Sequence, residues 1–404
     1  QGLIVRFAMV STRFAGLDGV SLETAKVAEA LERQGHQVVW FAGQLGPEFE
    51  PGECAPDAFF GTEENLALEA SAFGGGSPEF VAAQISDRAT RLAGDLDRFI
   101  DAFPPDVIVV QNAWAIPMQL PLAVALWEVV RSRSLPAIGH HHDFAWERDR
   151  FAHCVVPDVL EEVFPPVGDL VSHIVINQDA RDELALRKGV DATVLPNVMD
   201  FATGPPLSDG GASFRELCQV GEGTRILLQP TRIIPRKGIE LTIELAERLG
   251  SDVAVVVTHP DDKDDQYWGE LESLAEEQGV DLRLVDAGRD AASLSSAYAA
   301  ADLVCFPSLY EGYGNALVET MFHRRPLFVN SYSVYERDIA PLGIAAIEID
   351  GSITDEAVAQ ARRWIDDPST AEDAIELNTR IGLEHLSYQS VVDAFDRALS
   401  QIGQ

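Results

Sequence analysis

The stretch that decides the fold of this chain is Phe306-Pro307-Ser308-Leu309-Tyr310-Glu311-Gly312-Tyr313-Gly314-Asn315-Ala316-Leu317-Val318-Glu319. It begins at the end of an apolar run from Asp302 to Phe306, which predicts a strand, and it enters a helical pattern near Asn315. Glycines in the turn let the backbone approach a ligand closely. The start of a helix offers free N–H groups and a positive dipole end, which suit phosphate.

Two carboxylates frame this junction, since Glu311 and Glu319 are eight residues apart, a little over two helical turns. With Glu311 in the turn and Glu319 on the helix, both can face one pocket, one nearer a sugar and the other nearer a ribose. The alternative is a polar turn followed by an ordinary amphipathic helix. The pair alone is a weak signal, but its setting at a strand–turn–helix junction makes it specific.

In this setting the stretch resembles the E-x7-E motif of retaining glycosyltransferases with the two-domain GT-B fold, in particular the family 4 group (glycosyl transferases group 1). The resemblance implies that Glu311 and the neighbouring backbone N–H groups hold the hydroxyls of a donor sugar, and that Glu319 holds the ribose. The donor-binding residues that it implies here are Glu311, Gly312, Tyr313, Gly314, Asn315, Ala316, Leu317 and Glu319.

A second signature is Pro230-Thr231-Arg232-Ile233-Ile234-Pro235-Arg236-Lys237-Gly238, which follows a strand and opens a helix. Arginine offers a rigid fork for phosphate oxygens and lysine a mobile point charge, so two cations can hold a diphosphate and offset charge on the leaving group. The segment resembles the family's R-x4-K-G element, which assigns Arg232 and Lys237 to the donor diphosphate. The alternative is a basic helix start tied to surface carboxylates, where the helix dipole opposes the cations.

The loop Arg13-Phe14-Ala15-Gly16-Leu17-Asp18-Gly19-Val20-Ser21 follows the first predicted strand. It resembles the family's glycine loop, whose backbone faces the donor diphosphate and the acceptor, and Gly19 is the better-supported contact. The alternative is a common strand-to-helix loop with two glycines.

Three adjacent histidines stand in Gly139-His140-His141-His142-Asp143-Phe144-Ala145-Trp146-Glu147-Arg148-Asp149-Arg150-Phe151. Successive side chains of an extended segment point to opposite faces, so the three cannot converge on one metal. Many family 4 proteins have a histidine at this strand end that contacts the donor sugar. By that resemblance His142 is the first match and a catalytic candidate, with His141 second; the alternative is a polar loop with stacked imidazoles.

Three neighbouring residues of this loop are speculative acceptor candidates together with His141. Trp146 offers an aromatic face on which a sugar stacks, and Arg148 and Arg150 offer guanidinium groups for a carboxylate or phosphate. The predicted catalytic set is His142, Arg232, Lys237 and Glu311.

Three further segments carry less weight. Leu195-Pro196-Asn197-Val198-Met199-Asp200 resembles the family's P-N-G-V-D segment with a valine in place of glycine, which leaves Asn197 a minor candidate. The family's G-G-x-x-E segment lacks its glycines in Asn330-Ser331-Tyr332-Ser333-Val334-Tyr335-Glu336, where Glu336 is the match. The run Asp261-Asp262-Lys263-Asp264-Asp265 is interpreted as a solvated helix start and not as a metal-binding D-x-D motif, and no metal is expected.

Alternating apolar runs and helical patterns predict repeated βα units and hence parallel sheets covered on both faces. The predicted strands are 3–10, 37–42, 106–110, 135–139, 173–177 and 193–195 in the first half, and 225–229, 253–258, 282–285, 303–306, 326–329 and 345–349 in the second. Residues 45–76 are predicted to be an insertion with some helix. The segment from Phe201 to Ser213 is predicted to be a linker.

The fold class predicted is therefore α/β, with two Rossmann-like domains facing a central cleft, as in GT-B proteins. The domains are an acceptor domain at residues 1–203, a donor domain at 214–385, and a last helix at 386–404 that crosses back to the N-terminal domain, as is common among GT-B proteins. Ligands of such sheets sit beyond the carboxyl ends of the strands.

The composition excludes several classes of partner. The net charge of −35 argues against nucleic acid and against adhesion to anionic membranes, and no apolar run is long enough for a transmembrane segment. Four scattered cysteines form neither a zinc motif nor a disulfide framework and favour a cytoplasmic location. The acidity indicates a salt-adapted host or an ordinary acidic protein, and the oligomeric state is not accessible.

The function expected is transfer of a glucose- or mannose-type hexose from a UDP-, GDP- or ADP-sugar to a hydroxyl, with retention and without a required cofactor or metal. A small polar solute such as a glycosylated glycerate is a reasonable acceptor. The alternatives are a lipid or polysaccharide acceptor, a GT-B nucleotide-sugar epimerase, and a non-catalytic nucleotide-sugar binder. The charged set argues against the last, because unused buried charges are costly.

Overall fold

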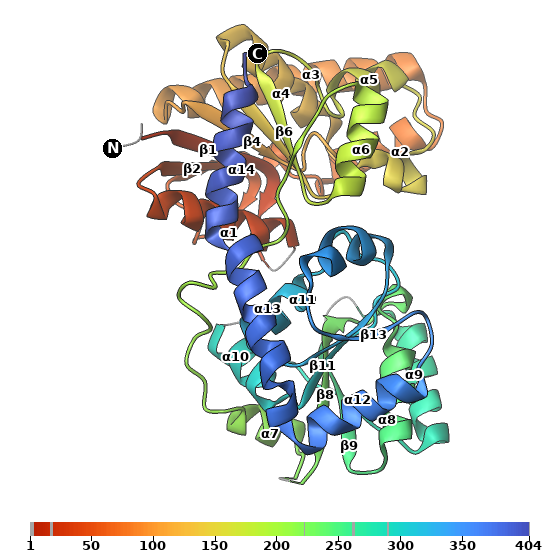
Figure 1. Ribbon diagram of the computed structural model, residues 1–404. Helices are drawn as coiled ribbons and strands as arrows, with labels where there is room; N and C mark the ends of the chain where they lie inside the picture. Colours follow the sequence, from red (N-terminus) through yellow and green to blue (C-terminus); the bar gives the residue numbers. More distant parts are fainter. Residues whose placement is uncertain (1–3, 17–18, 222, 261–262, 289–290, 404) are drawn as a thin grey trace. The chain divides into compact units, whose positions relative to one another are not determined.

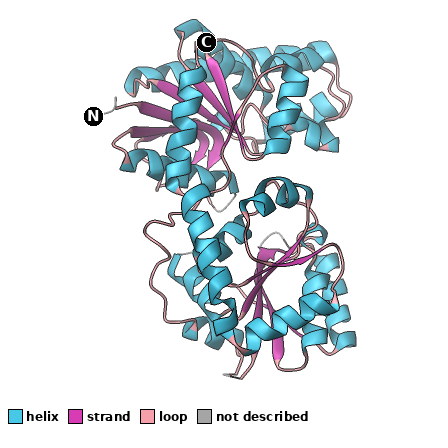
Figure 2. Cartoon of the chain, in the orientation of Figure 1, coloured by secondary structure: helices cyan, strands magenta, loops and turns pink. Residues whose placement is uncertain are grey.

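The computed structural model describes residues 4–16, 19–221, 223–260, 263–288 and 291–403. By internal contacts the chain divides into two compact units: unit 1 comprises residues 1–196 together with Tyr388–Gln404, and unit 2 comprises Asn197–Ser387. Each unit is a parallel β-sheet with helices packed against it (Figures 1 and 2). Within the described residues, no helix is both long enough and apolar enough to cross a membrane.

Unit 1 has a seven-stranded sheet in the order β3-β2-β1-β4-β5-β6-β7. Its strands are β1 (Arg6–Phe14), β2 (Gln37–Leu45), β3 (Gly52–Cys54), β4 (Val107–Gln111), β5 (Ala137–His141), β6 (Val171–Val175) and β7 (Thr193–Val194). Its α-helices are α1 (Gly19–Arg33), α2 (Glu63–Phe73), α3 (Pro78–Ala102), α4 (Leu120–Arg133), α5 (Pro157–Val163), α6 (Gln178–Lys188) and α14 (Tyr388–Gln401). Short 3-10 turns lie at η1 (Pro56–Ala58), η2 (Ala145–Glu147) and η3 (Asp149–Phe151).

Unit 2 has a six-stranded sheet in the order β10-β9-β8-β11-β12-β13. Its strands are β8 (Arg225–Arg232), β9 (Val253–His259), β10 (Asp281–Leu284), β11 (Leu303–Phe306), β12 (Leu327–Asn330) and β13 (Ile347–Ile349). Its α-helices are α7 (Ala212–Cys218), α8 (Ile239–Leu249), α9 (Asp265–Gln278), α10 (Ala291–Ala300), α11 (Asn315–Phe322), α12 (Asp355–Asp366) and α13 (Glu372–His385). Its short turns are η4 (Pro235–Lys237), η5 (Tyr335–Ile339), η6 (Ala340–Leu342) and η7 (Pro368–Ala371).

Alternation along the central strands explains why both faces of each sheet are buried. In β1, Ala8 and Val10 enter the core formed with α3 and α4, whereas the Phe7 ring meets Phe395 of α14 edge-on at 5.6 Å. In β8, Leu227 packs with α8 and α9, and Ile226 enters a core formed with α7 and α10. These strands are continuous apolar runs because both of their faces are covered.

The strand boundaries depart from the sequence predictions where hydrogen bonding overrides the apolar pattern. The first strand was predicted to end at Val10, but β1 continues to Phe14 because its polar residues Ser11 and Arg13 still pair with β2. The predicted strand 173–177 was expected to reach Asn177, but β6 ends at Val175, since the Asn177 side chain caps α6 by accepting from the Ala180 N–H at 2.7 Å.

The segment 45–76, expected to be an insertion with some helix, contains β3, η1 and α2. The strand β3 lies at the sheet edge and pairs with β2 from Trp40 to Ala42. Three residues that include a glycine leave too little apolar pattern for a sequence-based prediction of this strand.

The C-terminal helix α14 is built into unit 1 by contacts along its whole length. The Tyr388 hydroxyl donates to Glu29 of α1 at 2.8 Å, and the Arg33 guanidinium lies 5.0 Å from the centre of the Tyr388 ring. At the far end the Gly403 N–H donates to the Asp169 carbonyl at 2.8 Å. The helix therefore covers the face of the sheet that carries Phe7.

Truncating the centre of this contact tests its contribution. Phe395 is 1% exposed, and Phe395→Ala is expected to lower the free energy of unfolding by about 3–5 kcal/mol through lost burial and a residual cavity. Leu383→Ala, at a residue that is 50% exposed, is the matched control and should change it by less than about 0.5 kcal/mol. Equal midpoints of urea unfolding for the two variants would contradict the role given to α14.

Candidate active site

The turn between β11 and α11 is shaped by a glycine in an unusual conformation. Gly314 has φ +121°, and a Cβ there would lie 2.9 Å from the Phe306 ring and 3.0 Å from the Tyr332 hydroxyl. Gly314 is also the N-cap of α11 and supplies no side chain to its first N–H groups. The helix start is therefore bare of a capping side chain, as an anion or sugar site requires.

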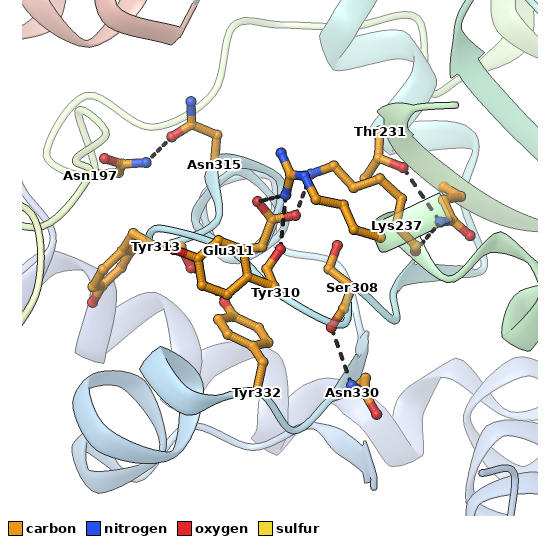
Figure 3. A network of polar contacts seen from close by, with 12 residues as sticks. Asn197, Thr231, Lys237, Ser308, Tyr310, Glu311, Tyr313, Asn315, Asn330 and Tyr332 are labelled. Atoms are coloured by element: carbon orange, nitrogen blue, oxygen red, sulfur yellow. Dashed lines mark hydrogen bonds and ion pairs between the residues drawn. The ribbon is translucent and has the colours of Figure 1, made fainter. Parts of the chain in front are cut away.

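Glu311, in this turn, is the acceptor for two cations (Figure 3). One carboxylate oxygen accepts from the Lys237 ammonium, and the other accepts from the Arg236 guanidinium at 2.9 Å. The Glu311 and Lys237 side chains are 9% and 10% exposed, and that of Arg236 is 36% exposed. Two motifs that are more than 70 residues apart in sequence thus meet in one buried ion cluster.

Burial raises the pKa of Glu311, but the positive charges of Lys237 and Arg236 together outweigh it and hold the pKa below its ordinary value. Burial lowers the pKa of Lys237, an effect that the Glu311 carboxylate opposes and that the charges of Arg236 and Arg232 reinforce. Glu311 is therefore an ionised carboxylate at neutral pH.

Backbone contacts fix the two segments against each other. The Leu309 N–H donates to the Arg236 carbonyl at 2.8 Å. Gly238 has φ +61°, and a Cβ there would lie 2.4 Å from the Pro307 carbonyl oxygen. A glycine is required at this position, which explains the glycine that follows the basic pair.

Arg232, the other predicted diphosphate ligand, lies at the end of β8 with its side chain exposed. It is close enough to Lys237 that its charge helps to lower the Lys237 pKa. The predicted pair Arg232 and Lys237 is thus brought together, and Arg236, which the sequence prediction passed over, joins them through Glu311. The signal for Arg236 was its place beside Lys237 in the basic motif.

Asn330, the last residue of β12, and Tyr332 just after it brace the turn (Figure 3). The Tyr332 hydroxyl donates to the Tyr313 carbonyl at 2.5 Å, and the Asn330 amide donates to the Ser308 carbonyl at 3.2 Å. Both side chains are buried, at 4% and 3% exposed. Burial, and then the charge of Glu311, raise the pKa of Tyr332, so its hydroxyl stays protonated as a donor.

This bracing was missed from sequence, although the signal was present. Tyr332 stands where the family pattern has a glycine, and the sequence prediction gave this tyrosine no role at the site. The Tyr332 side chain lies in the core next to Gly314, and its hydroxyl holds the turn through the Tyr313 carbonyl.

Glu319 lies on α11 and accepts a hydrogen bond from the Tyr298 hydroxyl at 2.7 Å. Tyr298 is buried and stacks on His323 with ring centres 4.4 Å apart. Burial raises the pKa of Tyr298 and lowers that of His323 to about 4, so both rings are neutral supports for the carboxylate. Asn315, at the start of the same helix, accepts from the amide of Asn197, the minor candidate of the sequence prediction (Figure 3).

In unit 1 the three adjacent histidines divide between the two faces of the sheet, as extended backbone requires. His141 shares a 3.0 Å hydrogen bond between its Nε2 and the Nδ1 of His173 on β6. The His140 ring lies 4.5 Å from that of His142. A Cβ on Gly139 would lie 2.7 Å from the His141 ring, so this glycine makes room for the imidazole pair.

His142, the predicted sugar contact, is partly buried at the end of β5. Its Nε2 donates to the Gln111 side-chain oxygen at 3.2 Å, and its backbone N–H donates to the Asn112 side chain at 2.9 Å. The Asn112 amide in turn donates to Asp143 at 2.8 Å. Residues at the ends of β4 and β5 thus hold the ring in place.

The acceptor candidates are engaged within unit 1. Trp146 stacks on Phe144 at 4.2 Å, and the Arg187 guanidinium lies 5.1 Å from the centre of the Trp146 ring. Arg148 pairs with Asp143, and Arg150 lies 3.8 Å from Glu69. These three side chains are thus tied to neighbours within unit 1.

Gly19 is the first residue of α1, and a Cβ there would meet nothing within 4 Å. Leu17 and Asp18 of the same glycine loop, and Asp261 and Asp262 of the acidic run, lie outside the described residues. In the described remainder of that run, Asp264 caps α9 by accepting from the Tyr267 N–H at 3.0 Å. Across the described residues, no three His, Cys, Asp or Glu side chains form a group that could hold a metal ion.

The imidazole pair makes stability depend on pH in a defined direction. Burial, with a contribution from Lys188, lowers the pKa of His173 from 6.5 to about 4, and burial also lowers that of His141. A depressed histidine pKa leaves stability intact above pH 6.5 and removes it as the pH falls toward 4, because the unfolded chain takes up the proton first.

Between pH 7 and pH 5, His173 should therefore cost about 2 kcal/mol of unfolding free energy. His173→Gln should remove most of that difference, whereas His153→Gln, at an exposed histidine, should not. Urea unfolding at the two pH values measures both. An unchanged pH difference in His173→Gln would contradict the burial of a neutral pair.

The comparisons with known proteins agree with this geometry. Residues 215–380 match the family model described as glycosyl transferases group 1, a range that contains Arg232, Lys237, Glu311 and Glu319. The chain is 29% identical to the mannosylglucosylglycerate synthase of Thermotoga maritima, covering 97% of this chain and 99% of that protein.

Two solved structures share the fold over 98% of this chain. The sucrose-phosphate synthase of Thermosynechococcus elongatus is 16% identical with a TM-score of 0.67 over 98% of its own length. The Anabaena protein HepE, solved with UDP and glucose, is 15% identical with a TM-score of 0.68 over 99% of its length.

The sequence expectation of a GT-B fold is thus confirmed, with two parallel-sheet α/β units and neighbours of that fold. The glycosyltransferase expectation is supported by the matched family and by the curated relative. The chain is a glycosyltransferase with the GT-B fold, and its residues 215–380 match the family model of glycosyl transferases group 1.

Proposed function

We propose that this protein transfers a hexose from a nucleotide-diphosphate sugar to a hydroxyl of a small glycerate-type acceptor, with retention of anomeric configuration. The observation that carries the proposal is the buried meeting of Lys237 and Arg236 with Glu311 at the start of α11. Such a cluster combines phosphate-binding cations with a carboxylate that can accept from sugar hydroxyls.

The substrate classes are supported by the relatives. The relative from Thermotoga maritima is named for the synthesis of mannosylglucosylglycerate, so we take a mannosyl donor and glucosylglycerate as the first pair to test. HepE was solved with UDP and glucose, which supports a nucleotide-linked donor. The nucleotide of the donor is UDP, GDP or ADP, and the transfer assay below distinguishes the three.

The proposed roles in unit 2 are supported by the contacts of these side chains and by the family resemblance. Arg232 and Lys237 hold the diphosphate, Glu311 and the backbone from Gly312 to Leu317 hold the sugar, and Glu319, positioned by Tyr298, holds the ribose. For Gly19 and His142 of unit 1, the roles toward diphosphate and sugar rest on the family resemblance alone. The same applies to Arg148 and Arg150 as ligands of the acceptor carboxylate.

In the reaction the bond between the anomeric carbon and the diphosphate oxygen breaks, and the acceptor oxygen bonds to the anomeric carbon on the same face. The acceptor proton goes to the departing phosphate oxygen. The protein contributes positioning and stabilisation of the negative charge that builds on the diphosphate. No step in this scheme uses a metal ion.

Transfer is tested by incubating the protein with UDP-, GDP- and ADP-linked glucose or mannose, with glucosylglycerate, glycerate or glycerol as acceptor. The expected result is one glycosylated glycerate, whose anomeric proton coupling reports the configuration. Lys237→Ala should lower kcat/KM by about 100-fold, since a charge partner of the leaving group is lost. The matched control is Arg380→Ala, an exposed cation on α13 that should leave kcat/KM unchanged.

Product formed equally by wild type and Lys237→Ala would remove the donor assignment. Nucleotide-sugar binding without transfer to any acceptor would favour a non-catalytic binder. Formation of an epimeric nucleotide sugar would favour the epimerase alternative.

The bracing of the donor turn yields a separate prediction. Tyr332→Phe removes the hydroxyl that donates to the Tyr313 carbonyl, a hydrogen bond that stabilises the turn by about 1 kcal/mol. The kcat/KM for the donor should therefore fall about fivefold. Tyr335→Phe is the matched control, because Tyr335 is equally buried but its hydroxyl donates to Glu348 instead. Steady-state kinetics and melting temperatures of both variants check this. Similar melting shifts accompanied by equal kcat/KM values would reduce Tyr332 to a stability role.

A further inference from the structure

Glu311 has one set of partners in the structure and another in its proposed role. Each of its oxygens accepts from a cation, one from Lys237 and the other from Arg236. The proposed function needs Lys237 on the donor diphosphate and Glu311 on sugar hydroxyls. A bound diphosphate would therefore compete with the Glu311 carboxylate for the same cations.

The pairing of Lys237 with Glu311 has a clear energetic reason. A lysine side chain that is 10% exposed carries a charge that is expensive to bury without a partner. Glu311, itself 9% exposed, supplies the compensating charge together with the hydrogen-bond acceptors. The Glu311 carboxylate offers the two cations a negative charge and a pair of acceptor oxygens, as a phosphate group would.

We propose that Glu311 is a built-in stand-in for the donor diphosphate, and that Arg236 is a further phosphate ligand. When the donor binds, its diphosphate takes over Lys237 and Arg236, and the released Glu311 carboxylate turns to the sugar. This inference rests on the proposed function and adds to it an exchange of partners and a third cation.

Arg236 is suited to this exchange. Its NH1 group donates to the Tyr310 carbonyl at 2.8 Å as well as to Glu311, and its side chain is 36% exposed. A guanidinium has five N–H donors, so it can keep the Tyr310 carbonyl while other N–H groups turn to a phosphate. Arg236 thereby couples arrival of the diphosphate to the conformation of the turn that holds the sugar.

The exchange predicts that the Glu311 carboxylate competes with the diphosphate for Lys237 and Arg236. Glu311→Gln removes the competing charge, so it should bind the nucleoside diphosphate about tenfold more tightly while losing transferase activity. Arg236→Gln should bind it about tenfold more weakly, and it should do so in the Glu311→Gln background as well. The corresponding nucleoside, which lacks phosphates, should bind all of these variants equally.

The experiment is isothermal titration with UDP, GDP and ADP to find the nucleotide that the wild type binds, followed by titration of that nucleotide and its nucleoside into each variant. Glu376→Gln, an exposed carboxylate on α13, is the control for removing one negative charge from a strongly acidic chain. Its affinity for the nucleotide should equal that of the wild type.

The outcomes separate the two levels of inference. No binding of any nucleotide to the wild type would overturn the proposed function itself. Nucleotide binding that is equal or weaker in Glu311→Gln, or unchanged in Arg236→Gln, would leave the donor site standing and overturn the exchange. If Glu311→Gln does not fold, the Arg236→Gln titration decides alone, because that half-exposed side chain can be replaced without burying a new group.

Discussion

The buried ion pair between Glu311 and Lys237 is the interaction on which the rest of unit 2 depends. It joins the segment that follows β8 to the segment that follows β11, and these two strands are neighbours in a parallel sheet. Parallel strands present their carboxyl ends at the same edge of the sheet, so the loops that follow β8 and β11 meet at that edge.

A pair as buried as this one contributes little net stability, since both charges are removed from water. Its value lies in specifying one arrangement of the two loops, and the neighbouring uncharged contacts share that task. Gly238 and Leu309 lock the backbones together, and Asn330 and Tyr332 support the turn from the next strand. A network in which each buried polar group has its partner rigidifies a site, whereas a partly satisfied one would not.

The overall charge and the local charge of this protein differ in sign. The chain carries −35, yet Arg232, Arg236 and Lys237 lie within one short segment beside the Glu311 carboxylate. Exposed charges farther away than about a Debye length are screened, so the local cluster outweighs the distant surface charge at this site. Under the proposed function, the acidic surface would affect the approach of an anionic donor and hence the dependence of its binding rate on salt.

Much of this protein could be predicted from sequence because the decisive signals are local. The βα alternation, the strand–turn–helix at Phe306 to Glu319, and the basic segment ending in Gly238 depend on residues close together in the chain. They predict the fold class and the proposed donor half of the site. The edge strand β3, the pairing of Arg236 with Glu311, and the bracing by Tyr332 depend on which strands lie side by side. Only the tertiary structure decided these contacts, because hydrogen bonds and ion pairs between distant segments leave no periodic pattern in either segment alone.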